Sequence, residues 1–386
     1  MKYLFIPVFV LGLVLNAAAK DRINFRQIDK SKPEQKPVEG TIEKEDWQGV
    51  TIKLEGSATS TYAWEKIQEG GVEYGDEPAG IREAKGEREK GNMEGAAAGF
   101  TKAAEGLKDK PIFLVHALFN AGLCYQSLKK HDDAIKSYDD LAKAVPGNRF
   151  FKETHYNKIH CYLEKGDLAG AKTAIEAAEK AAKDLSVDQP FQILMSLKKA
   201  EVIEKEGNDA EATGKFQAVA AQAGSKYPAI AGKAKLGVAR VQMKSNPTSA
   251  QGTYESITRE FKGQRGVMGE AFTGLGDCLM SQGEAKGDMD MIKRAALQYE
   301  QTVVLYFPAE GQPTAAYEKA LAVGGGAYVL LAQKATSDRA REMYATQARS
   351  MALTLLDQYP ASSYKQQATD VRTKADDELA KVPKNK

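Results

Sequence analysis

Residues 116–146 have the sequence HALFNAGLCYQSLKKHDDAIKSYDDLAKAVP, and this stretch decides the fold. Gly122 and Ala134 are small residues at the positions where the two helices of a hairpin would cross closely. Tyr138 stands one turn beyond Ala134 on the same helix face, where it is available to a neighbouring repeat. Pro146 ends the second helix because proline cannot continue an α-helix. The stretch therefore predicts a helical hairpin.

One element of this hairpin, an alanine followed four residues later by a large apolar or aromatic residue, recurs six times along the chain. Consecutive alanines are 38, 37, 41, 38 and 45 residues apart. A period of this size is typical of stacked supersecondary units, each of which buries its apolar face on its neighbour. The pairs are Ala96/Phe100, Ala134/Tyr138, Ala171/Ile175, Ala212/Phe216, Ala250/Tyr254 and Ala295/Tyr299.

These features closely resemble the tetratricopeptide repeat (TPR), whose helix pair places large, Gly/Ala, Tyr, Ala, aromatic, Ala and Pro residues at the offsets found in residues 116–146. The sequence YPASSY at residues 359–364 is similar to the joints between repeats in TPR proteins of the bacterial cell envelope. The resemblance implies a mainly α protein, a right-handed α-solenoid of about seven helical hairpins. A polar last helix at residues 363–382 is expected to cap the open end of the stack.

Two irregularities in the repeats need a local explanation. Seven extra residues within 283–290 are expected to separate the two helices of the sixth hairpin. Three consecutive glycines, residues 324–326, lie inside a helical pattern. No strand precedes them and no Gly-Lys-Ser/Thr follows, so they lack the mechanism of a phosphate loop. We expect them to mark a close helix crossing.

The first nineteen residues have the pattern of a secretory signal peptide. Lys2 precedes an apolar run over residues 3–15, and Ala17, Ala18 and Ala19 fit a small-residue cleavage site. The run is shorter than the roughly 20 residues that a transmembrane helix needs. We expect cleavage of residues 1–19 and a secreted or periplasmic mature chain. The cleavage point has no cysteine, so no lipobox is present, and no later stretch predicts a transmembrane segment.

Residues 20–78 differ from the repeats that follow in residues 79–386. Four alternating, β-branched stretches lie between residues 23 and 62, and residues 67–74 are either a last strand or the approach to the first helix. Alternation with a period of two predicts short strands. We expect a small SH3-like β domain. The only two tryptophans, Trp47 and Trp64, are predicted to fill its core.

Composition and cysteine placement restrict the function. The chain has 54 basic and 52 acidic residues and a net charge of +2, which disfavours nucleic acid as a partner.

Cys124 and Cys161 each precede the alanine of their repeat by ten residues, and Cys278 has the same Gly-x-Cys context as Cys124. Equivalent positions in adjacent helices lie about 10 Å apart, and a disulfide requires Cα atoms within about 7 Å. We predict three core residues that keep their thiols.

No catalytic, cofactor-binding or metal-binding residue is predicted. Core cysteines are inert, which argues against a cysteine nucleophile. His155 and His160 are five residues apart, not the four that would place both on one helix face for zinc. Asp288 and Asp290 lack the rest of a calcium-loop pattern. We predict that the protein is not an enzyme and needs no cofactor.

The resemblance to TPR proteins implies a concave groove lined by the first helix of each hairpin, in which a protein or peptide partner binds. Carried onto this chain, the groove positions of the family are His116, Phe119, Leu123, Gln126, Tyr156, His160, Glu164, Glu201 and Lys205. Aromatic and histidine side chains in a concavity favour a protein or peptide ligand.

Three hypotheses for the function follow. The first is a secreted or periplasmic scaffold that binds protein partners in its groove, with a role in cell-envelope assembly. The second is a module that binds a cell-wall polymer or polysaccharide, with Trp47 and Trp64 of the β domain stacked on sugars. The third is an enzyme, which no group of residues supports. The state of homo-oligomerisation is left open.

Overall fold

The computed structural model describes residues 20–27, 35–54, 56, 58–308 and 315–383. The predicted signal peptide, residues 1–19, lies outside the described residues. The chain divides into two compact units. The first comprises Met1–Cys124 and Ser137–Thr154, and the second comprises Tyr125–Lys136 and His155–Lys386. No helix in the described part of the chain is long and apolar enough to cross a membrane.

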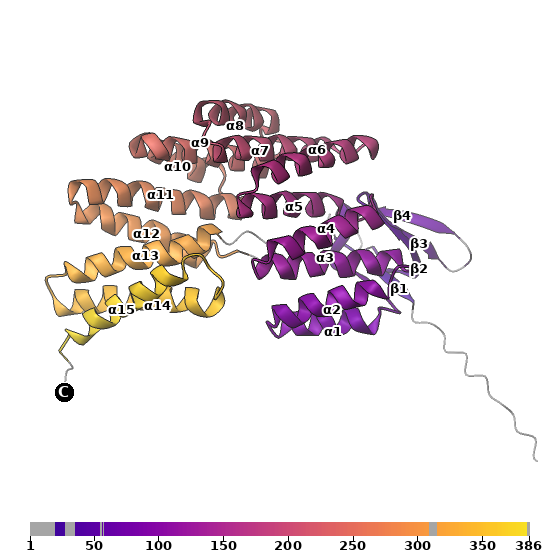
Figure 1. The fold of residues 1–386 in the computed structure, drawn as a ribbon, viewed down its shortest axis with the longest axis horizontal. Helices are drawn as coiled ribbons and strands as arrows, with labels where there is room; N and C mark the ends of the chain where they lie inside the picture. Colours follow the sequence, from indigo (N-terminus) through magenta and orange to yellow (C-terminus); the bar gives the residue numbers. More distant parts are fainter. Residues whose placement is uncertain (1–19, 28–34, 55, 57, 309–314, 384–386) are drawn as a thin grey trace, which may run out of the picture. The chain divides into compact units, whose positions relative to one another are not determined.

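The first unit begins with a five-stranded antiparallel sheet of strand order β4-β3-β2-β1-β5 (Figure 1). Its first strand pairs with both the second and the last, so the two ends of the segment meet within one sheet. This is the small SH3-like sheet that the alternating sequence predicts. The strands are β1 (Asp21–Phe25), β2 (Val38–Glu45), β3 (Gly49–Leu54), β4 (Thr59–Ala63) and β5 (Ile67–Glu73).

Neither tryptophan is among the buried residues of the sheet's core, so the prediction that both fill it was wrong, although Trp64 packs against this core. The buried residues are aliphatic side chains and one phenylalanine: Ile23, Phe25, Ile42, Val50, Ile52 and Ile67. Trp47 lies in the turn between β2 and β3, and Trp64 begins the short helix η1 (Trp64–Lys66). Both lie outside the alternating inward positions of the strands and are half-buried. Trp64 also donates its indole Nε1–H to the backbone oxygen of Asp46 at 2.7 Å, a bond that a purely apolar core would not provide.

The described residues after the sheet form fifteen α-helices, which pair in chain order into seven hairpins followed by one last helix (Figure 1). This is the TPR-like arrangement that the repeat predicts. The helices are α1 (Ala79–Glu89), α2 (Met93–Glu105), α3 (Pro111–Ser127), α4 (His131–Ala144), α5 (Phe151–Lys165), α6 (Leu168–Asp184), α7 (Gln189–Lys205), α8 (Asp209–Ala223), α9 (Pro228–Ser245), α10 (Pro247–Glu260), α11 (Arg265–Lys286), α12 (Met289–Leu305), α13 (Ala315–Gln333), α14 (Asp338–Gln358) and α15 (Lys365–Ala380).

All six alanine–apolar pairs lie on the second helices of the first six hairpins, and none of the twelve side chains is more than 4% exposed. The repeat in the sequence therefore marks the core of the stack. Several of the aromatic rings pack on a glycine of a first helix. A Cβ atom added to Gly122 would lie 2.4 Å from Tyr138 within one hairpin. A Cβ added to Gly237 would lie 2.5 Å from Phe216 of the preceding hairpin.

The two irregularities resolve differently. The extra residues of the sixth hairpin do not separate its helices, because they lengthen α11, which continues to Lys286. Gly287 then ends that helix with a positive φ of 66°, and Asp288 caps α12 through the backbone N–H groups of Asp290 and Met291. At Gly324, a Cβ would lie 2.6 Å from Tyr299 Cβ, which confirms the predicted close crossing.

Candidate functional site

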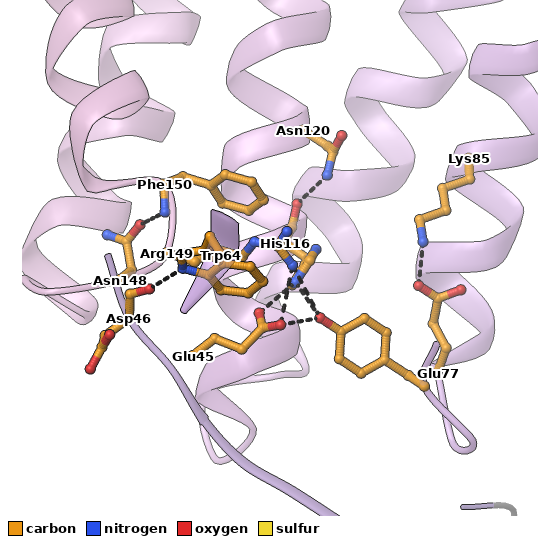
Figure 2. A network of polar contacts seen from close by, with 11 residues as sticks. Glu45, Asp46, Trp64, Glu77, Lys85, His116, Asn120, Asn148, Arg149 and Phe150 are labelled. Atoms are coloured by element: carbon orange, nitrogen blue, oxygen red, sulfur yellow. Dashed lines mark hydrogen bonds and ion pairs between the residues drawn. The ribbon is translucent and has the colours of Figure 1, made fainter. Parts of the chain in front are cut away.

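A polar network in the first unit joins the sheet to the helices (Figure 2). Glu45, the last residue of β2, is buried. Its carboxylate accepts hydrogen bonds from Tyr74 Oη at 2.6 Å and from His116 Nε2 at 3.0 Å, and Arg149 Nη1 lies 3.1 Å away. Tyr74 follows β5, His116 belongs to α3, and Arg149 lies between α4 and α5. One carboxylate therefore binds three segments that are distant in the sequence. We call these four residues the Glu45 network.

The protonation pattern of the Glu45 network follows from its geometry. Burial alone would raise the pKa of Glu45, but the hydrogen bond and charge of His116 and the charge of Arg149 lower it below its ordinary value. Burial and the neighbouring Glu45 carboxylate raise the pKa of Tyr74, so its hydroxyl keeps its proton and donates it to Glu45. His116 Nε2 lies 3.0 Å from the same hydroxyl, so the hydrogen of that contact belongs to the imidazole.

Arg149 also connects the network to the tryptophans. Its guanidinium carbon lies 4.1 Å from the ring centroid of Trp64 and 4.9 Å from that of Phe150. Figure 2 shows Arg149 beside Trp64, with Glu45 below it. Trp47 has a similar neighbour, because Lys152 Nζ lies 5.5 Å from its ring centroid. A cation of the chain itself thus lies against each tryptophan.

Two of the predicted groove residues, His116 and Phe119, contact side chains of the first unit. His116 belongs to the Glu45 network, and Phe119 stacks on Phe150 with ring centroids 4.0 Å apart and an interplanar angle of 6°. Phe119 is 8% exposed. The contact between Glu45 and His116 has no local signal, because the two residues are 71 positions apart in the chain. A contact of His116 and Phe119 with a partner protein stays a prediction.

In the second unit, three of the predicted groove residues on α5 and α7, namely Tyr156, His160 and Glu201, lie in one charged cluster. Lys198 Nζ lies 4.2 Å from the ring centroid of Tyr156 and 2.8 Å from Glu201 Oε2. Lys233 of α9 donates to Tyr156 Oη at 3.3 Å. His160, one turn beyond Tyr156 on α5, lies within the electrostatic reach of both Lys198 and Glu201. Helices α5, α7 and α9 therefore contribute to one surface.

The cluster continues onto α11 through Arg240 of α9. Arg240 forms a two-bond ion pair with Glu204 of α7, with Nε and Nη2 at 3.1 and 2.7 Å from the two carboxylate oxygens. Its Nη1 lies 3.9 Å from Glu270 of α11. Four consecutive first helices thus meet, α5 through the contacts of Tyr156 with Lys198 and Lys233, and α7, α9 and α11 through the ion pairs of Arg240. We call this set the first-helix cluster: Tyr156, His160, Lys198, Glu201, Glu204, Lys233, Arg240 and Glu270.

The charges of this cluster stabilise one another. Burial alone would lower the pKa of Lys198, but Glu201 and Tyr156 raise it above its ordinary value. Burial would likewise raise the pKa of Glu201, but Lys198 and Arg240 lower it. His160 behaves differently, because burial and the adjacent Lys198 lower its pKa to about 4. At neutral pH the cluster therefore holds charged lysine, arginine and glutamate side chains around a neutral imidazole.

The remaining predicted groove residues lie outside the Glu45 network and the first-helix cluster. Leu123 and Gln126 are half-buried on α3, and Glu164 and Lys205 are exposed at the C-terminal ends of α5 and α7. The structure therefore brings Tyr156, His160 and Glu201 together in the first-helix cluster. Their role in binding a partner stays a prediction.

Sequence reasoning missed four members of the cluster, Lys198, Lys233, Arg240 and Glu270. Three of them, Lys233, Arg240 and Glu270, lie on α9 and α11. The groove positions of the TPR family were assigned only on the hairpins before these helices. Lys198 is adjacent to a groove position, and its long apolar stem lets the ammonium group reach Tyr156 while 3% of the side chain is exposed. Glu204, in contrast, is a groove position that the TPR resemblance assigns, three residues or about one turn after Glu201.

The cysteines are buried, as predicted. Burial raises the pKa of Cys161 and of Cys278 to about 12, so neither forms a thiolate near neutral pH. Within the described ranges, no group of three or more histidine, cysteine, aspartate or glutamate side chains is placed to hold a metal ion.

Neither a protein-family model nor a curated protein matches the sequence. Solved structures do match. A tetratricopeptide repeat protein from Parabacteroides merdae is 15% identical, with a TM-score of 0.44 over 77% of this chain and 97% of that one. Yeast Tom70 is 14% identical, with a TM-score of 0.46 over 74% of this chain and 60% of that one.

A Rap protein, solved in complex with Competence and Sporulation Factor, is 10% identical, with a TM-score of 0.43 over 73% of this chain and 81% of that one. At these identities the chain is similar to TPR proteins in fold alone. Its TPR-like character is carried by its own seven helical hairpins and by their buried alanine–aromatic pairs.

Proposed function

We propose that the protein is a non-enzymatic scaffold that binds an extended or helical segment of a partner protein along its first helices. The observation that carries the proposal is the first-helix cluster, which runs over α5, α7, α9 and α11. Tyr156 offers a rigid aromatic anchor, and the partly exposed Arg240 and Glu270 offer polar contacts to a peptide. Recognition and not turnover is the expected activity.

The paired charges make this surface suitable for recognition. Arg240 is already fixed by Glu204, so a partner does not have to order this side chain when it binds. A surface that is ordered before binding loses less conformational entropy in the complex. A partner segment would therefore find the positions of its polar contacts already set.

A site-specific photo-cross-linking residue tests the proposal. It replaces Tyr156 in one variant of the full chain and Gln222, an exposed residue of α8, in a matched control. After irradiation in cells, we expect the Tyr156 variant to form a discrete adduct whose mapped contact is a short segment of one partner protein. The Gln222 control should not form this adduct.

Two results contradict the proposal. One is the absence of an adduct at Tyr156 while the protein is expressed and folded. The other is the same adduct, at the same yield, from Tyr156 and from Gln222, because a partner of the first helices would not reach both positions equally.

We also propose that the scaffold is secreted or periplasmic and acts in assembly of the cell envelope. Support comes from the signal-like pattern of residues 1–19 and from the YPASSY joint at residues 359–364. Fractionation followed by mass spectrometry tests this proposal. We expect a mature chain that begins near Lys20 in the envelope or exported fraction. A chain that retains residues 1–19 in the cytoplasmic fraction would contradict it.

A second candidate function is binding of a cell-wall polymer through the sheet. The observation in its favour is that Trp47 and Trp64 are half-buried and outside the core. Titration with soluble cell-wall glycan should then quench tryptophan fluorescence in the wild type and less in a Trp47→Phe variant. Unchanged fluorescence at saturating glycan would rule this candidate out.

A further inference from the structure

Apolar and polar contacts both attach the sheet to the helices. Ile112 of α3 packs against the core of the sheet, and Tyr74, which follows β5, contacts Phe113 of α3 edge to face with ring centroids 5.4 Å apart. Beside these contacts lies the Glu45 network, in which Glu45 is the acceptor for Tyr74, His116 and Arg149. The exposed fraction of the Glu45 side chain is 2%. A buried carboxylate with three donors binds these segments only while it is ionised, because a protonated carboxyl has one hydrogen to place and less charge to offer.

We propose that the Glu45 network is an acid-sensitive latch that fixes the sheet to α3 and to the segment between α4 and α5 at neutral pH and releases it in acid. Every titratable or charged group that contacts Glu45 contributes in the same direction. Protonated Glu45 no longer attracts Arg149, and it competes with Tyr74 and His116 as a third donor in the same small space.

The direction of the pH response follows from the lowered pKa of Glu45. A carboxyl whose pKa is lower in the folded state stabilises that state at pH values above its unfolded pKa. The stabilisation is lost as the pH falls through the lower, folded pKa. The latch is therefore closed at neutral pH and opens below the ordinary carboxyl value of 4.5.

The chain contains its own reporter of the latch. Arg149, which binds Glu45, also lies over the ring of Trp64 at 4.1 Å. Release of Arg149 would uncover one face of this indole ring. A Trp47→Phe background leaves Trp64 as the only tryptophan of the chain. Fluorescence then reports on the network alone, and far-UV circular dichroism reports separately on the helices.

The test uses the full chain in the Trp47→Phe background, titrated from pH 7 to pH 3 with acrylamide as a quencher. We expect quenching of Trp64 to rise below pH 4.5 while the helical signal is retained. Glu45→Gln, which mimics the protonated carboxyl, should show the high quenching already at pH 7 and lose the transition. Glu43→Gln, at an exposed position of the same strand, is the matched control and should titrate like the parent.

A second variant covers the case in which Glu45→Gln does not fold. Tyr74→Phe removes one hydrogen bond that favours the ionised carboxyl, so its transition should move to higher pH. The proposal is overturned if Glu45→Gln retains the transition of the parent, or if Tyr74→Phe leaves the midpoint unchanged. It is equally overturned if quenching rises only together with the loss of helical signal, because that result describes global unfolding.

Discussion

Lys198 and Glu201 form an ion pair inside the second unit, with Nζ and Oε2 2.8 Å apart on neighbouring turns of α7. The lysine side chain is 3% exposed, and the ring of Tyr156 covers its ammonium group. A buried pair of this kind contributes little compared with a well-packed apolar pair, but the loss of one partner is costly because a charge is left behind.

Lys198→Met should therefore lower the free energy of unfolding by about 3 kcal/mol, because Glu201 loses its nearest cation. The adjacent Lys199 offers a matched control, since it pairs with Glu179 at the surface. Lys199→Met should cost less than about 1 kcal/mol. Urea unfolding followed by circular dichroism measures both.

A double variant separates the lost charge from lost packing. Lys198→Met combined with Glu201→Leu removes both charges, and we expect it to recover most of the stability lost by Lys198→Met alone. If the double variant is less stable than Lys198→Met, the unpaired carboxylate is not the cause of the destabilisation.

The close approach of Gly237 to Phe216 predicts opposite effects for one substitution at two glycines. Gly237→Ala should cost about 2 kcal/mol, because its Cβ would lie 2.5 Å from a ring that is 0% exposed and has no room to move. Gly214→Ala, in the interior of α8, meets no atom within 4 Å and should stabilise the protein by about 0.5 kcal/mol. Thermal or urea unfolding measures the change in unfolding free energy of each variant. Changes of the same sign in both would contradict the packing described above.

Burial of neutral His160 predicts a loss of stability in mild acid. Its pKa is about 4 in the folded protein, below the ordinary value of 6.5, so the unfolded chain binds the proton more readily between these values. Stability should therefore fall as the pH decreases from 6.5 towards 4, by about 2 kcal/mol from this group. His160→Gln cannot titrate and should flatten this part of the curve of unfolding free energy against pH. An identical slope in the variant and the wild type would exclude His160 as the cause.

The buried thiols predict slow reaction with Ellman's reagent. Since burial raises the pKa of Cys161 and Cys278 to about 12, we expect both to resist modification in the native protein at pH 8. Unfolding in urea should make all three thiols of the chain reactive. If the thiols of the native protein released thionitrobenzoate from the reagent as fast as a small thiol does, these cysteines would not be core residues.

The helical part of the fold was readable from the sequence because its signal is local and repeated. Ala212 and Phe216 are four residues apart on one helix, and the same spacing recurs in neighbouring hairpins at a nearly constant period. Short-range periodicity of this kind records which face of each helix is buried. The burial of the six pairs therefore followed from sequence alone.

Long-range polar partners could not be read in this way. Glu45 and His116 are 71 residues apart and share no motif, so only the folded chain shows that they bind each other. The tryptophans failed as core predictions for a related reason. Hydrophobicity favours burial of Trp64, but its position in a short helix beside Arg149 leaves the ring half-buried. The end of α11 was predicted too early because Gly283 is a residue typical of turns. In the structure it lies inside the helix, which continues to Lys286.

The contacts between aromatic rings and glycines have a consequence for how such a chain can be rearranged. Tyr138 fills the space over a glycine of its own hairpin, whereas Phe216 and Tyr254 fill the space over glycines of the next one. Tyr299 does both, against Gly276 and Gly324. Each joint therefore has its own matching surfaces, and hairpins that look equivalent in sequence are not interchangeable modules. We expect that duplicating or transplanting one of the hairpins with such a ring would place the ring against a side chain instead of a glycine.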